Sequence, residues 1–221
     1  MSQLGNLTSL SFSNCNQLEK ITNLNYIADS VNNLFYGCGS LKSIQGTLTA
    51  RKSANSTFAE CLNLADIDNL ILQFNGVTDL SYCFKRCLKA KTSMIKKVLD
   101  ATNGTVIKAE AMCEMWSGNG QDGFGYPRDP NGRTLPSNLF ENCPNIKDTN
   151  LMFFGTGYTT IPGDLLDPCA TAINNTSAMF ACMSHLTSVG SNLLKNKLNL
   201  LEDTLNASLA RKFMEIYKDI C

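Results

Sequence analysis

The sequence has almost no net charge and no long apolar run. Its 221 residues carry 19 basic and 19 acidic side chains, which gives a formal net charge of +0. A balanced charge gives no general attraction for nucleic acid or for an anionic membrane surface, so we expect no nucleic-acid partner. No stretch approaches the roughly 18 to 20 consecutive apolar residues that a membrane-spanning helix needs, so we also expect no membrane insertion.

The N-terminus lacks the pattern of an export signal. Residues 1–7 contain no basic cluster, and no apolar run follows them. We therefore expect the chain in the cytoplasm of the producing cell or in a virion assembled there. The bacterial cell surface is the alternative if the chain is a fragment of a longer, exported protein.

An internal repeat is the main feature that the sequence does have. The spacing Phe-x-x-Cys-x-x-Leu-x-x-Ile begins at Phe12, Phe35 and Phe58, so the interval in residue number is 23 both times (35 − 12 and 58 − 35). A fixed period in this range indicates supersecondary units, each of which covers its apolar side only with the units before and after it. We therefore expect a repeat protein whose function lies on a surface and not in a catalytic pocket.

The repeat continues in a weaker form towards the C-terminus. The interval from Phe58 to Phe84 is 26 (84 − 58), and the interval from Phe84 to a candidate fifth unit, Met112-x-x-Met115, is 28 (112 − 84). Phe140 resumes the motif after the same interval of 28 (140 − 112), which supports counting the fifth unit.

Two further units are expected near the end of the ladder. Phe180-x-x-Met183 has Met in the Cys place, and Phe153 followed by Ile161 is interpreted as a distorted half unit. The total is then roughly seven or eight units. The expected structural ladder consists of the Phe and Cys positions of these units, namely Phe12, Cys15, Phe35, Cys38, Phe58, Cys61, Phe84, Cys87, Phe140, Cys143 and Phe180.

These motifs resemble the BspA-like leucine-rich repeats of bacterial surface proteins and of some bacteriophage proteins. The likeness rests on the spacing above and on the stretch VTDLSYCFKRCL at residues 77–88, and it covers about residues 7–190. The resemblance implies a leucine-rich-repeat solenoid that serves adhesion or protein recognition and has no enzymatic activity. Bacterial members are usually exported, and the N-terminus of this chain departs from that pattern.

The expected fold is an α/β repeat solenoid with a C-terminal helix. Residues 1–191 would form a leucine-rich-repeat-like right-handed coil of short strands and turns or short helices, with an insertion at residues 116–136. From residue 192 to 221 the period changes to that of an amphipathic helix, which either caps the last repeat or pairs with another subunit. Its apolar positions are Leu194, Leu198, Leu201, Leu205, Leu209, Phe213, Ile216 and Ile220.

The ten cysteines divide into a periodic set and a scattered set. The periodic set would stack with a spacing of about 5 Å, which permits disulfides. We nevertheless expect small buried thiols that fill each turn in a reducing compartment. In the scattered set only Cys83 and Cys87 are close in sequence, and their spacing is not that of a zinc or redox motif, so we expect no metal site and no cofactor. The periodic set is Cys15, Cys38, Cys61, Cys87 and Cys143, and the remaining cysteines are Cys83, Cys113, Cys169, Cys182 and Cys221.

No motif of the sequence predicts catalysis. Glu110 and Glu114 are expected to share an exposed helix face, whereas the paired carboxylates of glycosidases face each other across a cleft. The single histidine, His185, excludes a site with two imidazoles, and repeats seldom build the closed pocket that a Cys–His pair requires. The G-x-G-x-x-G match at residues 118–123 leads into a loop rich in helix breakers and not into a helix, so it does not indicate a nucleotide site.

The insertion is the segment with the most recognition-like composition. It contains residue types that dominate binding hot spots, and repeat proteins often place insertions on their binding face. The alternative is that Trp116 and Phe124 fold back and fill space over a weak repeat. The candidate binding residues are Trp116, Phe124, Tyr126, Arg128 and Arg133.

The sequence therefore predicts a non-enzymatic structural or recognition protein. Its partners would be other protein subunits or a host-surface protein or glycan, and the ends of the solenoid could dock onto a partner or onto another copy. We favour a component of a bacteriophage virion, such as a tail, neck or head decoration protein. The alternatives are a fragment of a bacterial surface adhesin and an accessory module of a glycan-acting enzyme.

Overall fold

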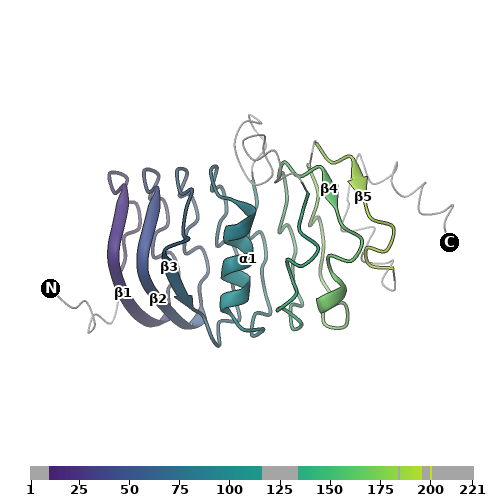
Figure 1. The fold of residues 1–221 in the computed structure, drawn as a ribbon, viewed down its shortest axis with the longest axis horizontal. Helices are drawn as coiled ribbons and strands as arrows, with labels where there is room; N and C mark the ends of the chain where they lie inside the picture. Colours follow the sequence, from purple (N-terminus) through teal and green to yellow (C-terminus); the bar gives the residue numbers. More distant parts are fainter. Residues whose placement is uncertain (1–9, 116–133, 184, 196–199, 201–221) are drawn as a thin grey trace.

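The computed structural model describes residues 10–115, 134–183, 185–195 and 200. These residues form a row of similar repeats that lie side by side along the long axis (Figure 1). The elements, in chain order, are β1 (Lys20–Ser30), β2 (Ser43–Ser53), β3 (Leu70–Gln73), α1 (Thr92–Ala101), β4 (Thr160–Ile161), a 3-10 helix (Asp167–Cys169) and β5 (Ser188–Val189).

The strands of neighbouring repeats pair in parallel. The order in the first sheet is β1-β2-β3, in which Tyr26 lies opposite Leu48 and Leu48 opposite Leu72. In the second sheet β4 pairs in parallel with β5. Parallel pairing of consecutive strands requires the chain to return to the same end between them, as expected for a leucine-rich repeat.

A glycine allows β1 and β2 to approach where their register shifts. Gly46 has a φ of 125°, and a Cβ placed on it would clash with the carbonyl oxygen of Leu24 in β1. Any side chain at this position would therefore force the two neighbouring backbones apart.

The helix α1 accommodates extra residues of the fourth repeat. The interval from Phe84 to Cys113 is 29 in residue number (113 − 84), compared with 23 from Phe12 to Phe35 (35 − 12). Ten helical residues span only about 15 Å, the length of four to five strand residues, so the longer repeat fits beside β3. The helix buries Met94, Ile95 and Val98 towards the core, and it lies next to β3 (Figure 1).

Aromatic rings form a column through the first four repeats. The ring of Phe35 lies 5.5 Å from that of Phe12 and 5.7 Å from that of Phe58, and Phe58 lies 5.3 Å from Phe84. Adjacent planes differ by only 10° to 11°. Phe35 and Phe58 each lie between two rings of the column, and both are fully buried, as is Phe84.

One backbone hydrogen bond fixes how consecutive repeats align. The N–H of Phe58 donates to the carbonyl of Cys83 at 3.0 Å, that is, to the residue that precedes Phe84. The same bond recurs from Phe84 to Met112 at 2.8 Å. The residues at this position, here called the Phe position, define repeats 1 to 7 and are Phe12, Phe35, Phe58, Phe84, Cys113, Phe153 and Phe180.

This alignment corrects the sequence prediction in the later repeats. Cys113, and not Met112, occupies the Phe position of repeat 5, because its N–H donates to Met152 at 2.9 Å. Phe153 therefore follows it in repeat 6, and its ring stacks on that of Phe180 at 5.7 Å. The expected place of Phe140 in this ladder is wrong.

Phe140 and Cys143 lie in a different turn of their repeat. Asn145 Nδ2 donates to the carbonyl of Gly104 at 2.8 Å, and Asn142 Nδ2 donates to Asp100 at 3.0 Å, so this turn packs beside the end of α1. The backbone of Cys143 still bonds to Phe140, three residues earlier, as Cys38 bonds to Phe35. The two kinds of turn thus bury side chains at the same spacing, which explains why the motif did not distinguish them.

The expected C-terminal helix lies almost entirely outside the described residues. Residues 191–195 form turns, and Leu193 and Leu194 are buried in them. Among the described helices, none is long and apolar enough to cross a bilayer.

Truncation of one ring in the column tests how far the repeats depend on one another. Phe58→Ala should lower the free energy of unfolding by about 3 to 5 kcal/mol, because it leaves a cavity between two rings. Urea denaturation followed by circular dichroism measures the change. Ile71→Ala on β3 is the control, because Ile71 is 60% exposed. It should change stability by about 0.5 kcal/mol or less, and an equally small effect of Phe58→Ala would contradict the account.

Candidate recognition surface

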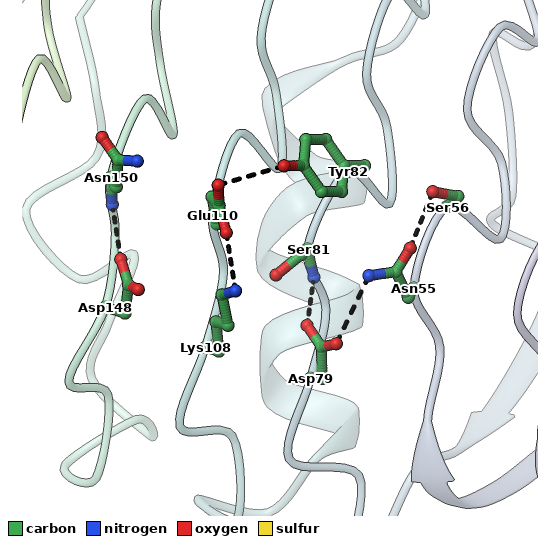
Figure 2. Close-up of polar contacts among 9 residues, drawn as sticks. All are labelled: Asn55, Ser56, Asp79, Ser81, Tyr82, Lys108, Glu110, Asp148 and Asn150. Carbon is green, nitrogen blue, oxygen red and sulfur yellow. Dashed lines mark hydrogen bonds and ion pairs between the residues drawn. The ribbon is translucent and has the colours of Figure 1, made fainter.

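A row of polar side chains runs across repeats 3 to 6. Backbone bridges align Asp79 with Lys108 and Lys108 with Asp148, which places one residue of each repeat at the same height. Two or three residues later each repeat carries further polar side chains (Figure 2). We call the set the polar row, and it consists of Asn55, Ser56, Asp79, Ser81, Tyr82, Lys108, Glu110, Asp148 and Asn150.

The acidic residues of the polar row shape the turns that they occupy. Asp79 Oδ1 accepts a hydrogen bond from the N–H of Ser81 at 2.8 Å, and Asp148 Oδ1 accepts one from Asn150 at 3.0 Å. Such side chains stabilise tight turns by mimicking a backbone acceptor. Tyr82 follows the first turn with a φ of 60°, in the left-handed region. The carboxylates therefore hold the backbone and also reach the surface.

Side chains of the polar row also connect neighbouring repeats. Asn55 Nδ2 donates to Asp79 Oδ2 at 3.3 Å, and the hydroxyl of Tyr82 donates to Glu110 Oε1 at 3.0 Å. Lys108 Nζ lies 2.6 Å from Glu110 Oε2 within repeat 5. Figure 2 shows these contacts spread over three neighbouring repeats. Bonds of this kind restrict the side chains before any partner arrives.

The same contacts set the protonation states in the row. The hydrogen bond from Lys108 lowers the pKa of Glu110, against the effect of burial, and the bond from Tyr82 adds to it. The pKa of Lys108 is raised, chiefly by its hydrogen bond to Glu110. Burial raises the pKa of Tyr82, and the carboxylate of Glu110 raises it further. At neutral pH the row thus presents fixed charges of both signs.

Glu114 is the second acidic residue that the sequence singled out, and it has a separate partner. Its side chain is only 9% exposed, and its carboxylate lies 3.0 Å from Lys85 Nζ. The same Lys85 Nζ lies 5.3 Å from the centre of the Tyr82 ring. The expected helix face shared with Glu110 is wrong, because residues 110–113 form turns. Each glutamate is instead neutralised by its own lysine.

The thiols of repeats 2 to 4 form a second, buried column. Cys61 Sγ donates to the carbonyl of Phe35 at 3.0 Å, and Cys87 Sγ donates to that of Phe58 at the same distance. Cys38 Sγ makes the equivalent bond to Phe12. Each thiol therefore bonds to the preceding repeat as a protonated donor.

Burial keeps these thiols protonated. It raises the pKa of Cys61, and it raises that of Cys143 to about 12. Burial also raises the pKa of Cys87 well above its ordinary value. Since the thiolate is the nucleophile and the metal ligand, Cys61, Cys87 and Cys143 are poor nucleophiles and poor metal ligands. Among the residues that the structure describes, no group of three or more His, Cys, Asp or Glu side chains is arranged to hold a metal ion.

The candidate binding residues of the insertion lie outside the described residues. They are Trp116, Phe124, Tyr126, Arg128 and Arg133. The chain on either side is anchored, because Met115 N–H donates to Phe154 at 2.8 Å and Leu135 N–H donates to Thr160 at 3.1 Å. The insertion thus begins directly after Met115, five residues after Glu110 of the polar row (115 − 110).

Sequence reasoning missed most of the polar row. Asp79, Lys108 and Asp148 each stand five residues before a Phe position (84 − 79, 113 − 108 and 153 − 148). Counting five residues back from Phe84 would have found Asp79. Finding Lys108 in the same way requires knowing that Cys113 occupies the Phe position of its repeat.

The pH dependence of stability tests the Glu110 contacts. The folded pKa of Glu110 lies below its ordinary value of 4.5, so its charged form stabilises the fold above that pH. The contribution is lost as the pH falls through the folded pKa. Glu110→Gln should therefore destabilise the protein at about pH 7, and the difference from wild type should shrink at about pH 3.

Urea denaturation at the two pH values measures both differences. Glu19→Gln is the control, because Glu19 forms a surface pair with Lys42 and its side chain is 64% exposed. It should change stability little at either pH. A Glu110→Gln effect that is equal at both pH values would contradict the assigned contacts.

Comparison with known proteins places the first half of the chain in a family. The family model for the BspA type leucine-rich repeat region matches residues 2–106 in 6 copies. No curated protein and no solved structure matches the chain significantly. Backbone bridges of the same parallel kind continue beyond the matched region, from Lys108 to Asp148 and from Asp148 to Asn175. The chain therefore contains, over residues 2–106, a leucine-rich repeat region of the BspA type.

Proposed function

We propose that the whole chain is a non-enzymatic leucine-rich-repeat solenoid that recognises other proteins through the polar row. A leucine-rich repeat region indicates a role in protein–protein interaction. The observation that carries the proposal is the alignment of Asp79, Lys108 and Asp148 at one height in three consecutive repeats. Regularly spaced charges of both signs match a partner whose own charges have a complementary order.

The polar row is prepared for binding. The side chains of Lys108 and Glu110 are 42% and 21% exposed, so both are accessible and both are held by their mutual contact. Tyr82 is held in the same way through its hydroxyl. Because these groups lose little freedom on binding, more of the interaction energy remains as affinity.

The same contacts argue against catalysis. Cys61 and Cys87 are buried, and burial raises the pKa of both thiols, so neither supplies the thiolate that a cysteine enzyme needs. The pKa of Glu110 is lowered by its hydrogen bond from Lys108, whereas a carboxylate that acts as a general acid requires a raised pKa. Glu114 is paired with Lys85.

We further propose that the protein is a component of a bacteriophage virion, such as a tail, neck or head decoration. Thiols that must stay protonated to bond between repeats suit a chain that folds in a reducing cytoplasm and is assembled there. A surface adhesin would fold in an oxidising compartment, where neighbouring thiols form disulfides.

Site-specific photo-cross-linking in the culture that makes the protein tests both proposals. A cross-linking residue at position 148, in the polar row, should capture a structural protein of purified particles. The same residue at Asp164, which is exposed outside the row, is the matched control and should capture none. Recovery of the chain on the cell wall with Cys61 and Cys87 oxidised would replace the virion proposal by that of an adhesin. Release of sugars from surface glycan, abolished by Glu110→Gln, would overturn the non-enzymatic assignment.

We also propose that the insertion contributes hot spots to the same interface. Trp116→Ala should weaken binding of the cross-linked partner by about 2 kcal/mol or more, since a buried aromatic anchor dominates many interfaces. Calorimetric titration measures the affinity, and a thermal melt of the same variant should be almost unchanged. A large loss of thermal stability with unchanged affinity would assign Trp116 to the core instead.

A further inference from the structure

The thiol column has one end that reaches solvent. Cys15 occupies in repeat 1 the place that Cys38 occupies in repeat 2 and Cys61 in repeat 3. Cys38 and Cys61 are fully buried, whereas Cys15 is exposed. An oxidant dissolved in water can therefore reach the column at Cys15 without unfolding any repeat.

Cys15 and Cys38 converge on one atom. The backbone N–H of Cys15 and the thiol of Cys38 both donate to the carbonyl oxygen of Phe12, each at 3.0 Å. The backbones around them are also paired, because Asn14 N–H donates to Tyr36 at 2.7 Å. Equivalent residues of paired backbones lie about 5 Å apart, within the Cα range of disulfides.

We propose that Cys15 and Cys38 form an oxidisable dithiol that closes to a disulfide when the protein meets a hydroperoxide. Cys15 Sγ attacks the peroxide as a thiolate, which yields Cys15 sulfenic acid and releases the alcohol, or water from hydrogen peroxide. The thiol of Cys38 then attacks the sulfenic sulfur. The S–S bond forms as the S–O bond of the sulfenic acid breaks, and the hydroxyl leaves with the proton of Cys38 as water. The net reaction takes two thiols and one hydroperoxide to one disulfide, one alcohol and one water.

The burial of Cys38 sets the order of the two steps. Burial raises the pKa of Cys38, so this thiol is a poor first nucleophile. Its reaction costs the hydrogen bond to Phe12, but the Phe12 carbonyl keeps its bond from Cys15 N–H. The cross-link therefore forms without leaving a backbone group unpaired.

The disulfide would fasten the first repeat to the second. Leu10, Phe12 and Leu18 are only partly buried, in contrast to the fully buried Phe35 and Leu41 of repeat 2. Within the part of the chain that the structure describes, repeat 1 has a neighbouring repeat on one side only, so we expect it to open more easily than repeats 2 and 3. A bond between its turn and the next repeat opposes that opening. A chain folded in a reducing cytoplasm and then exposed to peroxide would gain this bond after assembly.

Cys182 provides an internal control. It is also exposed, but the equivalent residue of the preceding repeat is Gly155, whose N–H donates to Ala181 at 2.9 Å. Cys182 thus shares the access of Cys15 to solvent, but among the described residues the repeat before it offers no stacked thiol. Peroxide should convert it to a sulfenic acid that a dimedone probe captures, and not to a disulfide with a neighbouring repeat.

Peptide mass spectrometry of the reduced, full-length protein after treatment with hydrogen peroxide tests the proposal. A peptide pair linked through Cys15 and Cys38 should appear and should vanish on reduction. Cys38→Ser keeps the hydrogen-bond donor, and it should leave Cys15 as a dimedone adduct. Cys61→Ser, the matched control further along the column, should still form the Cys15–Cys38 bond.

Limited proteolysis gives a second readout of the cross-link. Cleavage within repeat 1 should slow by about tenfold or more after oxidation and recover after reduction, because a closed loop of this length resists opening. A disulfide between two molecules through Cys15, or oxidation of Cys15 to the sulfinic acid with Cys38 left free, would overturn the proposal. So would equal behaviour of Cys15 and Cys182 towards the probe.

Discussion

Each repeat of this protein depends on the backbone hydrogen bond that its Phe position donates to the next repeat. A single repeat cannot bury its own apolar side, so its stability comes from its two neighbours. The hydrogen bond from Phe58 to Cys83 fixes the alignment of repeat 3 with repeat 4, and the rings of Phe58 and Phe84 stack between the same two repeats. The thiol column and the polar row are aligned between repeats because this contact aligns the backbone.

Two further columns follow from that alignment, and they have opposite surroundings. In repeats 2 to 4 the thiols three residues after the Phe position face the interior, where they donate hydrogen bonds to the preceding repeat. The polar residues five residues before it reach the surface, where Asp79, Lys108 and Asp148 stand in line. The same periodicity thus gives the protein a uniform core and a varied surface. Variation on a fixed frame suits recognition, because side chains can change without disturbing the stacking.

The sequence was a good guide to the first four repeats and a poorer one beyond them. The constant interval between Phe12, Phe35 and Phe58 predicted the first three units, and the family match confirms their kind. The later register was wrong because two different turns of a repeat bury residues three apart. Phe140 and Cys143 satisfy that spacing as well as Phe35 and Cys38 do. Only the hydrogen bonds between repeats distinguish the two turns.

The candidate surface was harder to predict than the core. Its aligned positions hold Asp79, Lys108 and Asp148, so no single residue type marks them. Core positions are limited by volume and polarity, whereas exposed positions tolerate many side chains and leave no periodic signal. The helix α1 was missed for a related reason. The spacing of the motif shows that repeat 4 is longer than the others, but it does not show which part of the repeat holds the extra residues.

Scalar couplings across hydrogen bonds, measured by NMR on the deuterated protein, test the alignment most directly. The account predicts a coupling from the amide nitrogen of Cys113 to the carbonyl carbon of Met152, and another from Phe153 to Met179. These bonds continue the Phe position through the repeats in which the sequence motif fails. Absence of both couplings, with Met112 and Phe140 bonded in their place, would contradict the common frame on which the polar row and the thiol column rest.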